Sequence, residues 1–114
     1  MVNDPSTWEI TPQEVAEQLS SGQRIFLLDV REPEEYALAK LPEGELLPMG
    51  SVPGALSRLE GIAEEMPIVV YCHHGVRSLH VVAWLRTHGV EDCRSMAGGI
   101  DRYSREIDSI IPRY

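Results

Sequence analysis

The chain has 114 residues, which is enough for one domain with a single hydrophobic core, and we expect that domain to span residues 1–114. Ten lysines and arginines stand against eighteen aspartates and glutamates, giving a formal net charge of −8. This charge opposes nonspecific binding to nucleic acid and to anionic membranes, so neither is an expected partner.

Two cysteines, Cys72 and Cys93, are too few for a disulfide framework. No apolar run reaches the length of a membrane span. The first residues, Met1-Val2-Asn3-Asp4-Pro5, lack the charged and then apolar pattern of a signal peptide. These features predict a cytoplasmic protein whose thiols stay reduced.

In the first half of the chain, short apolar segments alternate with helical patterns, which is typical of the α/β class. Thr11-Pro12-Gln13-Glu14 is a capping box that predicts a helix ending near Gly22. Ile25-Phe26-Leu27-Leu28 is apolar on both faces, as in a central parallel strand. Asp29-Val30-Arg31 follows at the carboxyl edge of the sheet, and Pro33 then starts a short helix.

The middle of the chain predicts an edge strand at Leu46-Leu47-Pro48-Met49, because proline cannot join a central ladder, and a helix from about Pro53. The strongest helical pattern runs from Ser78 to His88. A short strand is expected from Val90 to Met96. Three isoleucines then pattern a last helix that ends at a proline: Ile107, Ile110, Ile111 and Pro112.

The most informative segment is Cys72-His73-His74-Gly75-Val76-Arg77, which joins the apolar run Ile68-Val69-Val70-Tyr71 to the helix expected from Ser78. The strand carries the sulfur to the sheet edge, and loop amides with the free N–H groups of a helix start can converge on an anion there. Gly75 supplies the backbone freedom that the bend needs, and Arg77 adds a cation. The segment therefore predicts thiol chemistry on a small anionic substrate.

A helix N-terminus and a nearby cation lower the pKa of a thiol, so Cys72 is expected to be partly thiolate. As a thiolate it would act as a nucleophile, and an anionic group that it holds would then sit among the N–H groups of His73 to Arg77. This prediction requires that the N–H groups point inward and that the thiol is not sealed off from solvent.

Three segments together resemble a known family, the single-domain rhodaneses, which are sulfurtransferases. They are the cysteine loop, Asp29-Val30-Arg31-Glu32 with Tyr36 after it, and Ala97-Gly98-Gly99-Ile100-Asp101. The resemblance implies a central, mainly parallel five-stranded sheet with helices on both faces. It also implies a thiosulfate sulfurtransferase-like enzyme, in which Cys72 attacks the outer sulfur of a donor such as thiosulfate and keeps that sulfur as a persulfide. The implied acceptor is a thiol, a cyanide-like molecule or an acceptor protein, and no cofactor is implied.

Two departures from the family's pattern bear on substrate preference and partner contacts. Lys40-Leu41-Pro42-Glu43-Gly44 stands where the family often has His-x-Pro-Gly-Ala, and Tyr103 stands where tryptophan is common. Neither lies in the cysteine loop, so the predicted chemistry is unaffected.

The resulting site prediction has Cys72 as the catalytic residue and His73, His74, Gly75, Val76 and Arg77 as substrate-binding residues. The histidines are expected mainly to contribute backbone N–H groups. Arg77 either pairs with a donor's oxyanion or braces the loop against a carboxylate. No metal is expected, because a Cys-His-His zinc site lacks an obvious fourth ligand.

Simpler structural roles are favoured for other residues: packing for Cys93, and pairing or capping for Asp29 and Arg31. Two other functions stay open. A cysteine-dependent phosphatase or arsenate reductase has five residues between cysteine and arginine, whereas this loop has four, and the tighter ring suits a single sulfur. A non-catalytic regulatory or sulfur-carrier binding module would be marked by loss of Cys72 or Arg77, and both are present.

Overall fold

The computed structural model describes residues 8–114 and builds them around a five-stranded sheet. All neighbouring strands pair in parallel, in the order β1-β5-β4-β2-β3. The strands are β1 (Glu9–Ile10), β2 (Phe26–Asp29), β3 (Glu45–Leu46), β4 (Ile68–Tyr71) and β5 (Cys93–Met96). The predicted α/β class and five-stranded sheet are therefore confirmed, and the sheet is parallel throughout the described residues.

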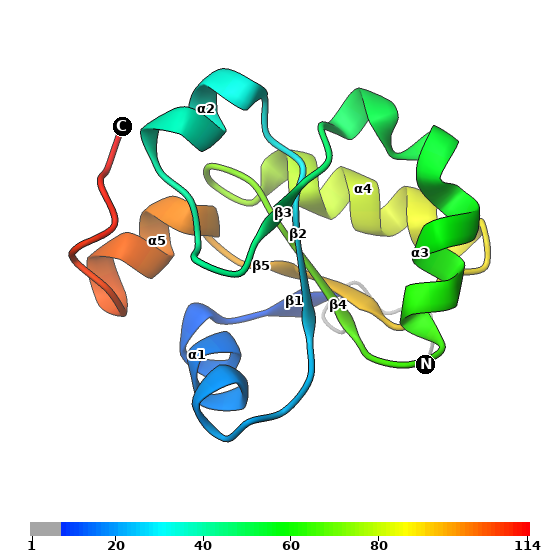
Figure 1. Ribbon diagram of the computed structural model, residues 1–114, viewed down its shortest axis with the longest axis horizontal. Coiled ribbons are helices and arrows are strands. Elements are labelled where there is room, and N and C mark those ends of the chain that lie inside the picture. The colour runs from blue at the N-terminus through cyan, green and yellow to red at the C-terminus, as the bar shows by residue number, and fades with distance from the viewer. Residues whose placement is uncertain (1–7) are drawn as a thin grey trace.

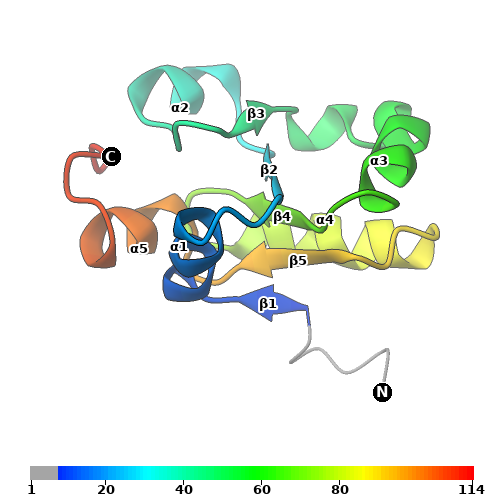
Figure 2. The same cartoon turned by 60° about the horizontal axis from the view of Figure 1, so that its bottom comes forward.

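Helices cover both faces of the sheet, as Figures 1 and 2 show. One face packs against α1 and α5, and the other against α3 and α4. The helices are α1 (Pro12–Ser20), α2 (Pro33–Leu38), α3 (Leu56–Ala63), α4 (Val76–Thr87) and α5 (Gly99–Glu106). None of the helices in residues 8–114 is both long enough and apolar enough to cross a membrane.

The central strand β4 contributes side chains to both halves of the core, because its side chains alternate between the two faces of the sheet. Ile68 and Val70 pack with α3 and α4, and Cys72, just beyond the strand, continues on that face. Val69 and Tyr71 point to the opposite face, against α1 and α5. All five residues are at most 1% exposed, so the end of β4 is a rigid base for the segment that follows.

Several local predictions are confirmed in detail. The capping box at the start of α1 has both of its hydrogen bonds between Thr11 and Glu14. The helix α2 begins at Pro33 as expected. An edge strand is also present, but β3 spans Glu45–Leu46, whereas the strand was predicted at residues 46–49, and Met49 already begins a 3-10 turn (Met49–Ser51). A 3-10 turn at Pro53–Ala55 precedes α3.

Two further boundaries also differ from the sequence-based expectation. The helix α4 begins at Val76, two residues before Ser78, because Gly75 is its N-cap and turns the chain with a left-handed φ of 98°. The strand β5 begins at Cys93, because the N–H of Val90 still binds the carbonyl of Leu85 and closes the end of α4.

The predicted last helix over Ile107, Ile110 and Ile111 is wrong. The helix α5 lies earlier and ends at Glu106. Beyond it, the carboxylate of Asp108 accepts the N–H of Ile110, a local turn that competes with helix formation. Ile111 is buried, and its carbonyl accepts the hydroxyl of Ser104, so this segment packs on α5 in irregular form.

Candidate active site

The cysteine loop lies at the carboxyl edge of the sheet, where open α/β sheets place their ligands. Cys72 directly follows β4, and α2 starts beside it after β2, the neighbouring strand. The bend between Cys72 and α4 depends on Gly75, because an added Cβ there would lie 3.1 Å from the backbone nitrogen of Gly98. The strand, the bend and the helix start thus bring the loop amides around one sulfur.

Two backbone N–H groups point at Cys72 Sγ, one from the predicted set His73 to Arg77 and one from the helix that follows. The N–H of Gly75 lies 3.1 Å from the sulfur and the N–H of Ser78 lies 3.3 Å from it. Ser78 is the third residue of α4, where the N–H has no partner inside the helix. The arrangement stabilises negative charge on sulfur or on a group that the sulfur holds.

A buried hydroxyl pair extends this environment. The Oγ of Ser78 lies 3.4 Å from Cys72 Sγ and 2.7 Å from the Oγ of Ser95 on β5. Both serines are fully buried. Ser95 therefore holds the hydroxyl of Ser78 against the sulfur.

The resting loop does not present its sulfur openly to solvent. Cys72 is 1% exposed as a residue, whereas the predicted reaction needs a thiol that a substrate can reach. The requirement for a thiol open to solvent is therefore not met in the resting structure, and access of a donor to Sγ requires the surroundings of the loop to move. Two loop residues are exposed: the side chain of His74 is 62% exposed, and Val76 as a whole residue is 65% exposed.

The start of α5 binds the backbone of the cysteine loop. The N–H of Ile100 donates to the carbonyl of Cys72 at 2.9 Å, and the N–H of Asp101 donates to the carbonyl of His73 at 3.1 Å. A Cβ at Gly99 would lie 2.3 Å from the His73 carbonyl oxygen and 2.5 Å from that of Cys72. Glycine is therefore required where these two segments meet.

Arg77 braces the loop. Its guanidinium makes a two-point ion pair with the carboxylate of Glu35 on α2, with N–O distances of 2.7 and 2.9 Å. This pairing, which is the main cause, lowers the pKa of Glu35 to about 2, and the same contact raises the pKa of Arg77. Of the two predicted roles for Arg77, the resting structure has the brace.

Glu35 also connects the loop to a buried ion pair. The hydroxyl of Tyr114 donates to Glu35 at 2.8 Å and accepts a hydrogen bond from Arg31 at 2.8 Å. Arg31 in turn binds both carboxylate oxygens of Asp29, and both residues are fully buried. This pairing agrees with the structural roles favoured for Asp29 and Arg31.

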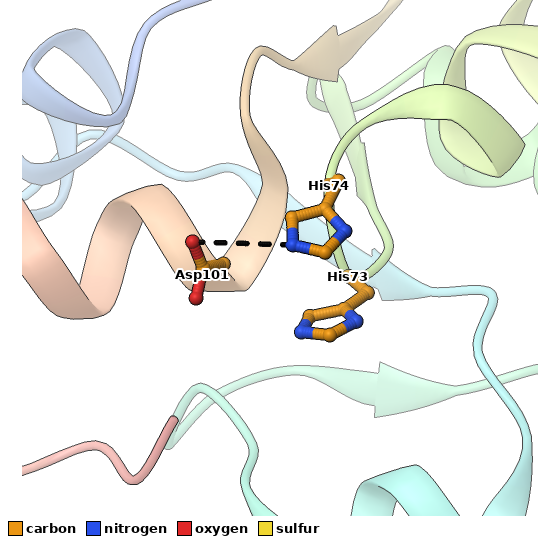
Figure 3. Close-up of side chains that lie close together, drawn as sticks. All are labelled: His73, His74 and Asp101. Atoms are coloured by element: carbon orange, nitrogen blue, oxygen red, sulfur yellow. Dashed lines mark ion pairs between the residues drawn. The ribbon is translucent and has the colours of Figure 1, made fainter. Parts of the chain in front are cut away.

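The two loop histidines stack on each other and lie beside an aspartate of α5, as Figure 3 shows. Their ring centroids are 3.9 Å apart, and the ring of Tyr114 stacks on the other side of His73, also at 3.9 Å. His74 Nε2 lies 4.0 Å from a carboxylate oxygen of Asp101. Burial, with a smaller effect of His74, lowers the pKa of His73, which favours its neutral form.

Possible ligand atoms of His73, His74 and Asp101 lie within 4.8 Å of one another, and Asp101 is a neighbour that the sequence did not predict for the histidines. Both oxygens of Asp101 are already bound, one by Arg113 at 2.9 Å and one by Arg105 at 3.1 Å. A metal ion would compete with two guanidinium groups for this carboxylate. The geometry therefore favours an ion-pair cluster at this position.

Sequence reasoning placed the loop correctly but missed three residues that complete the site: Glu35, Ser78 and Tyr114. Ser78 carried a signal, because the sequence placed it in the first turn of a helix, where N–H groups have no partner inside the helix. Glu35 lay in a segment already singled out, next to Tyr36, but its partner is 42 residues away. Tyr114 had no sequence signal, since its contacts depend on the irregular segment after α5.

Comparisons with known proteins all point to the same family, the rhodanese-like domains. The model of the rhodanese-like domain family matches residues 11–106. A sulfurtransferase of Allochromatium vinosum is 30% identical over 97 residues, which cover 85% of this chain and 88% of that protein. A rhodanese-like domain protein from Staphylococcus aureus, known from its crystal structure, has a TM-score of 0.77 and 27% identity, covering 93% of this chain and 97% of that one.

Larger proteins contain a similar region. A probable adenylyltransferase/sulfurtransferase MoeZ of Mycobacterium tuberculosis is 30% identical over 108 residues, which cover 92% of this chain. The match spans only 26% of that relative's length. The likeness to it therefore concerns one region of a longer protein.

Proposed function

Because this chain belongs to the rhodanese-like family, we propose that it is a sulfurtransferase in which Cys72 carries the transferred sulfur as a persulfide. One observation carries the proposal: the N–H groups of Gly75 and Ser78 converge on Cys72 Sγ at 3.1 and 3.3 Å. Backbone N–H groups that already point at the sulfur before the reaction stabilise negative charge there without rearrangement of the backbone. The sulfurtransferase relative from Allochromatium vinosum supports the same chemistry.

The first half of the proposed reaction loads the enzyme. The Cys72 thiolate attacks the outer sulfur of a sulfane donor, for which thiosulfate is the simplest probe. A new S–S bond forms to Cys72, the donor's S–S bond breaks, and sulfite leaves with the bonding electron pair. Cys72 then holds an anionic outer sulfur beside the amides of the loop.

The second half returns the enzyme to its resting state. A thiophilic acceptor, such as a thiol or cyanide, attacks the outer sulfur, and the electron pair of the S–S bond returns to Cys72 as the thiolate. An acceptor protein is also consistent with this scheme, since the similar region of the Mycobacterium tuberculosis relative lies within a longer adenylyltransferase/sulfurtransferase. Each step requires the surroundings of the loop to move, because Cys72 is 1% exposed at rest.

Mass spectrometry of the intact protein tests this proposal. Incubation with thiosulfate should add one sulfur atom, about 32 Da, and cyanide should remove it. Cys72→Ser should abolish the adduct, while the matched variant Cys93→Ser should keep it. Retention of the adduct in Cys72→Ser would place the sulfur elsewhere and overturn the assignment.

The same assay separates the alternatives. No adduct with any sulfane donor, together with hydrolysis of a phosphoester, would favour the phosphatase. Absence of both activities in a folded protein would favour a binding module. The ring of four residues between Cys72 and Arg77 supports sulfur over a tetrahedral oxyanion.

A further inference from the structure

The positive charge of the cysteine loop is already matched by a carboxylate. Arg77 lies in the first turn of α4, and both of its terminal nitrogens bind Glu35. The side chains are 32% and 19% exposed, so the pair is partly shielded from water. An anionic substrate that used Arg77 would have to compete with a partner fixed at two points.

Glu35 is itself held in place by two further hydrogen bonds. Its Oε1 accepts the N–H of Glu32 at 3.1 Å in the capping box of α2. Its Oε2 accepts the hydroxyl of Tyr114 at 2.8 Å. The carboxylate therefore cannot swing away from Arg77 without breaking contacts to α2 and to the segment after α5.

Other arginines near the loop are paired as well. Arg31 binds Asp29, and Arg105 and Arg113 share Asp101, the carboxylate that faces His74. The whole chain carries a formal charge of −8. Together with Arg77 and Glu35, these pairs set four arginines against three carboxylates, so the named groups leave one net positive charge for a substrate with two negative charges.

We propose that Glu35 is a specificity-determining residue, which makes the site favour sulfane donors with a single negative charge over dianionic thiosulfate. This inference rests on the proposed sulfurtransferase function. Thiosulfate carries charge on its sulfonate oxygens as well as on its outer sulfur. A donor with an organic group in place of one oxygen needs no cation there, and the amides of Gly75 and Ser78 still receive its sulfur.

Methanethiosulfonate is the matched probe, because a methyl group replaces one charged oxygen of thiosulfate and the reaction stays the same. The Cys72 thiolate attacks the outer sulfur, the new S–S bond forms, and the old S–S bond breaks. Methanesulfinate leaves with the electron pair, where thiosulfate would release sulfite. Because the same bonds form and break in both reactions, the two donors differ mainly in the second negative charge of thiosulfate.

The decisive experiment measures kcat/KM for the two donors, with cyanide as acceptor, in the wild type, Glu35→Gln and Glu34→Gln. Glu34 is the control, because it is exposed on the same helix and its change alters the charge equally. Because Glu35 also braces the loop through Arg77, the readout is the ratio of the two kcat/KM values, in which a general loss of activity cancels. In Glu35→Gln the ratio of thiosulfate to methanethiosulfonate should rise about tenfold, mainly through a lower KM for thiosulfate, and Glu34→Gln should leave the ratio unchanged.

A second measurement needs no variant. With wild-type protein, added salt should raise kcat/KM for thiosulfate, because screening weakens repulsion, and should affect methanethiosulfonate less. A fall with salt would indicate an available cation and overturn the inference. Equal loss of both donors in folded Glu35→Gln would also overturn it, since Glu35 would then only support the loop.

These outcomes are distinct from failure of the proposed function. If wild-type protein gains no sulfur on Cys72 from either donor, the sulfurtransferase proposal fails and the inference fails with it. If both donors load Cys72 and the donor ratio does not respond to Glu35→Gln, the function stands and the inference alone is wrong.

Discussion

The two cysteines of this protein have the same exposure and opposite surroundings. Cys72 and Cys93 are each 1% exposed. The sulfur of Cys72 accepts N–H groups from Gly75 and Ser78, whereas the thiol of Cys93 donates to the carbonyl of Val90 at 3.3 Å. One sulfur lies where negative charge is stabilised, and the other must keep its proton to make its hydrogen bond.

This difference shows that burial alone does not determine what a cysteine can do. Both residues belong to the same half of the core, packed against α3 and α4. Cys72 stands at the carboxyl edge of the sheet, where a bend and a helix start supply N–H groups without partners. Cys93 opens β5, and burial, the main cause, raises the pKa of its thiol to about 11.

The largest expected effect is in alkylation by iodoacetamide near neutral pH. Cys93 should react at least about 100-fold more slowly than Cys72, because so little of its thiol is ionised below its raised pKa. Its rate should climb as the pH approaches about 11, since the thiolate is the reactive form. Peptide mapping by mass spectrometry measures both sites, and similar rates at neutral pH would remove the contrast.

Gly99→Ala should disrupt the loop around Cys72. The new Cβ would collide with the carbonyls of Cys72 and His73, at 2.3 to 2.5 Å, in a backbone with a φ of +63°. We expect a loss of about 3 kcal/mol in unfolding free energy and a strong loss of sulfur loading. Denaturant unfolding and the mass assay measure these effects.

Gly22→Ala is the matched control for that substitution. Gly22 has a φ of +81°, but an added Cβ there would meet nothing within 4 Å. It should lose only about 1 kcal/mol and keep full sulfur loading. If both variants behaved alike, the contact between the start of α5 and the cysteine loop would carry no special weight.

Acid should act on the Glu35–Arg77 pair. Arg77 lowers the pKa of Glu35 from 4.5 to about 2, so this pair contributes its full stability above pH 4.5 and loses it as the pH falls toward 2. The contribution is roughly 2 kcal/mol. When the pH is lowered from about 5.5 to about 3, the free energy of unfolding, measured with denaturant, should therefore fall less in Glu35→Gln than in the wild type. Parallel curves would contradict the assignment.

The smallest expected effect concerns the hydroxyl beside Cys72. Ser78→Ala removes the Oγ that lies 3.4 Å from the sulfur and leaves the buried Oγ of Ser95 without that partner. Unfolding free energy should fall by about 1 kcal/mol and sulfur loading should slow by about tenfold. Ser95→Ala, which keeps the Ser78 hydroxyl, should slow loading less. Equal slowing would show that the serine pair acts only through packing.

Local patterns were sufficient for much of the fold. The capping box at Thr11, Pro33 at the start of α2, and the apolar residues of β2 and β4 each encode their structure within a few residues. The helix expected at Ile107 failed because Asp108 formed a turn with Ile110 that hydrophobic spacing does not register. Short-range hydrogen bonding outweighed periodicity at that point.

The sequence by itself determined the alternation of apolar strands and helices, the position of the cysteine loop and the helix that follows this loop, because these depend on contiguous residues. Only the tertiary structure decided the charge around that loop. Arg77 meets Glu35 from another helix, and Tyr114 reaches Glu35 across 79 residues. No local pattern specifies such partners, since packing of distant segments determines which carboxylate each guanidinium and hydroxyl can reach.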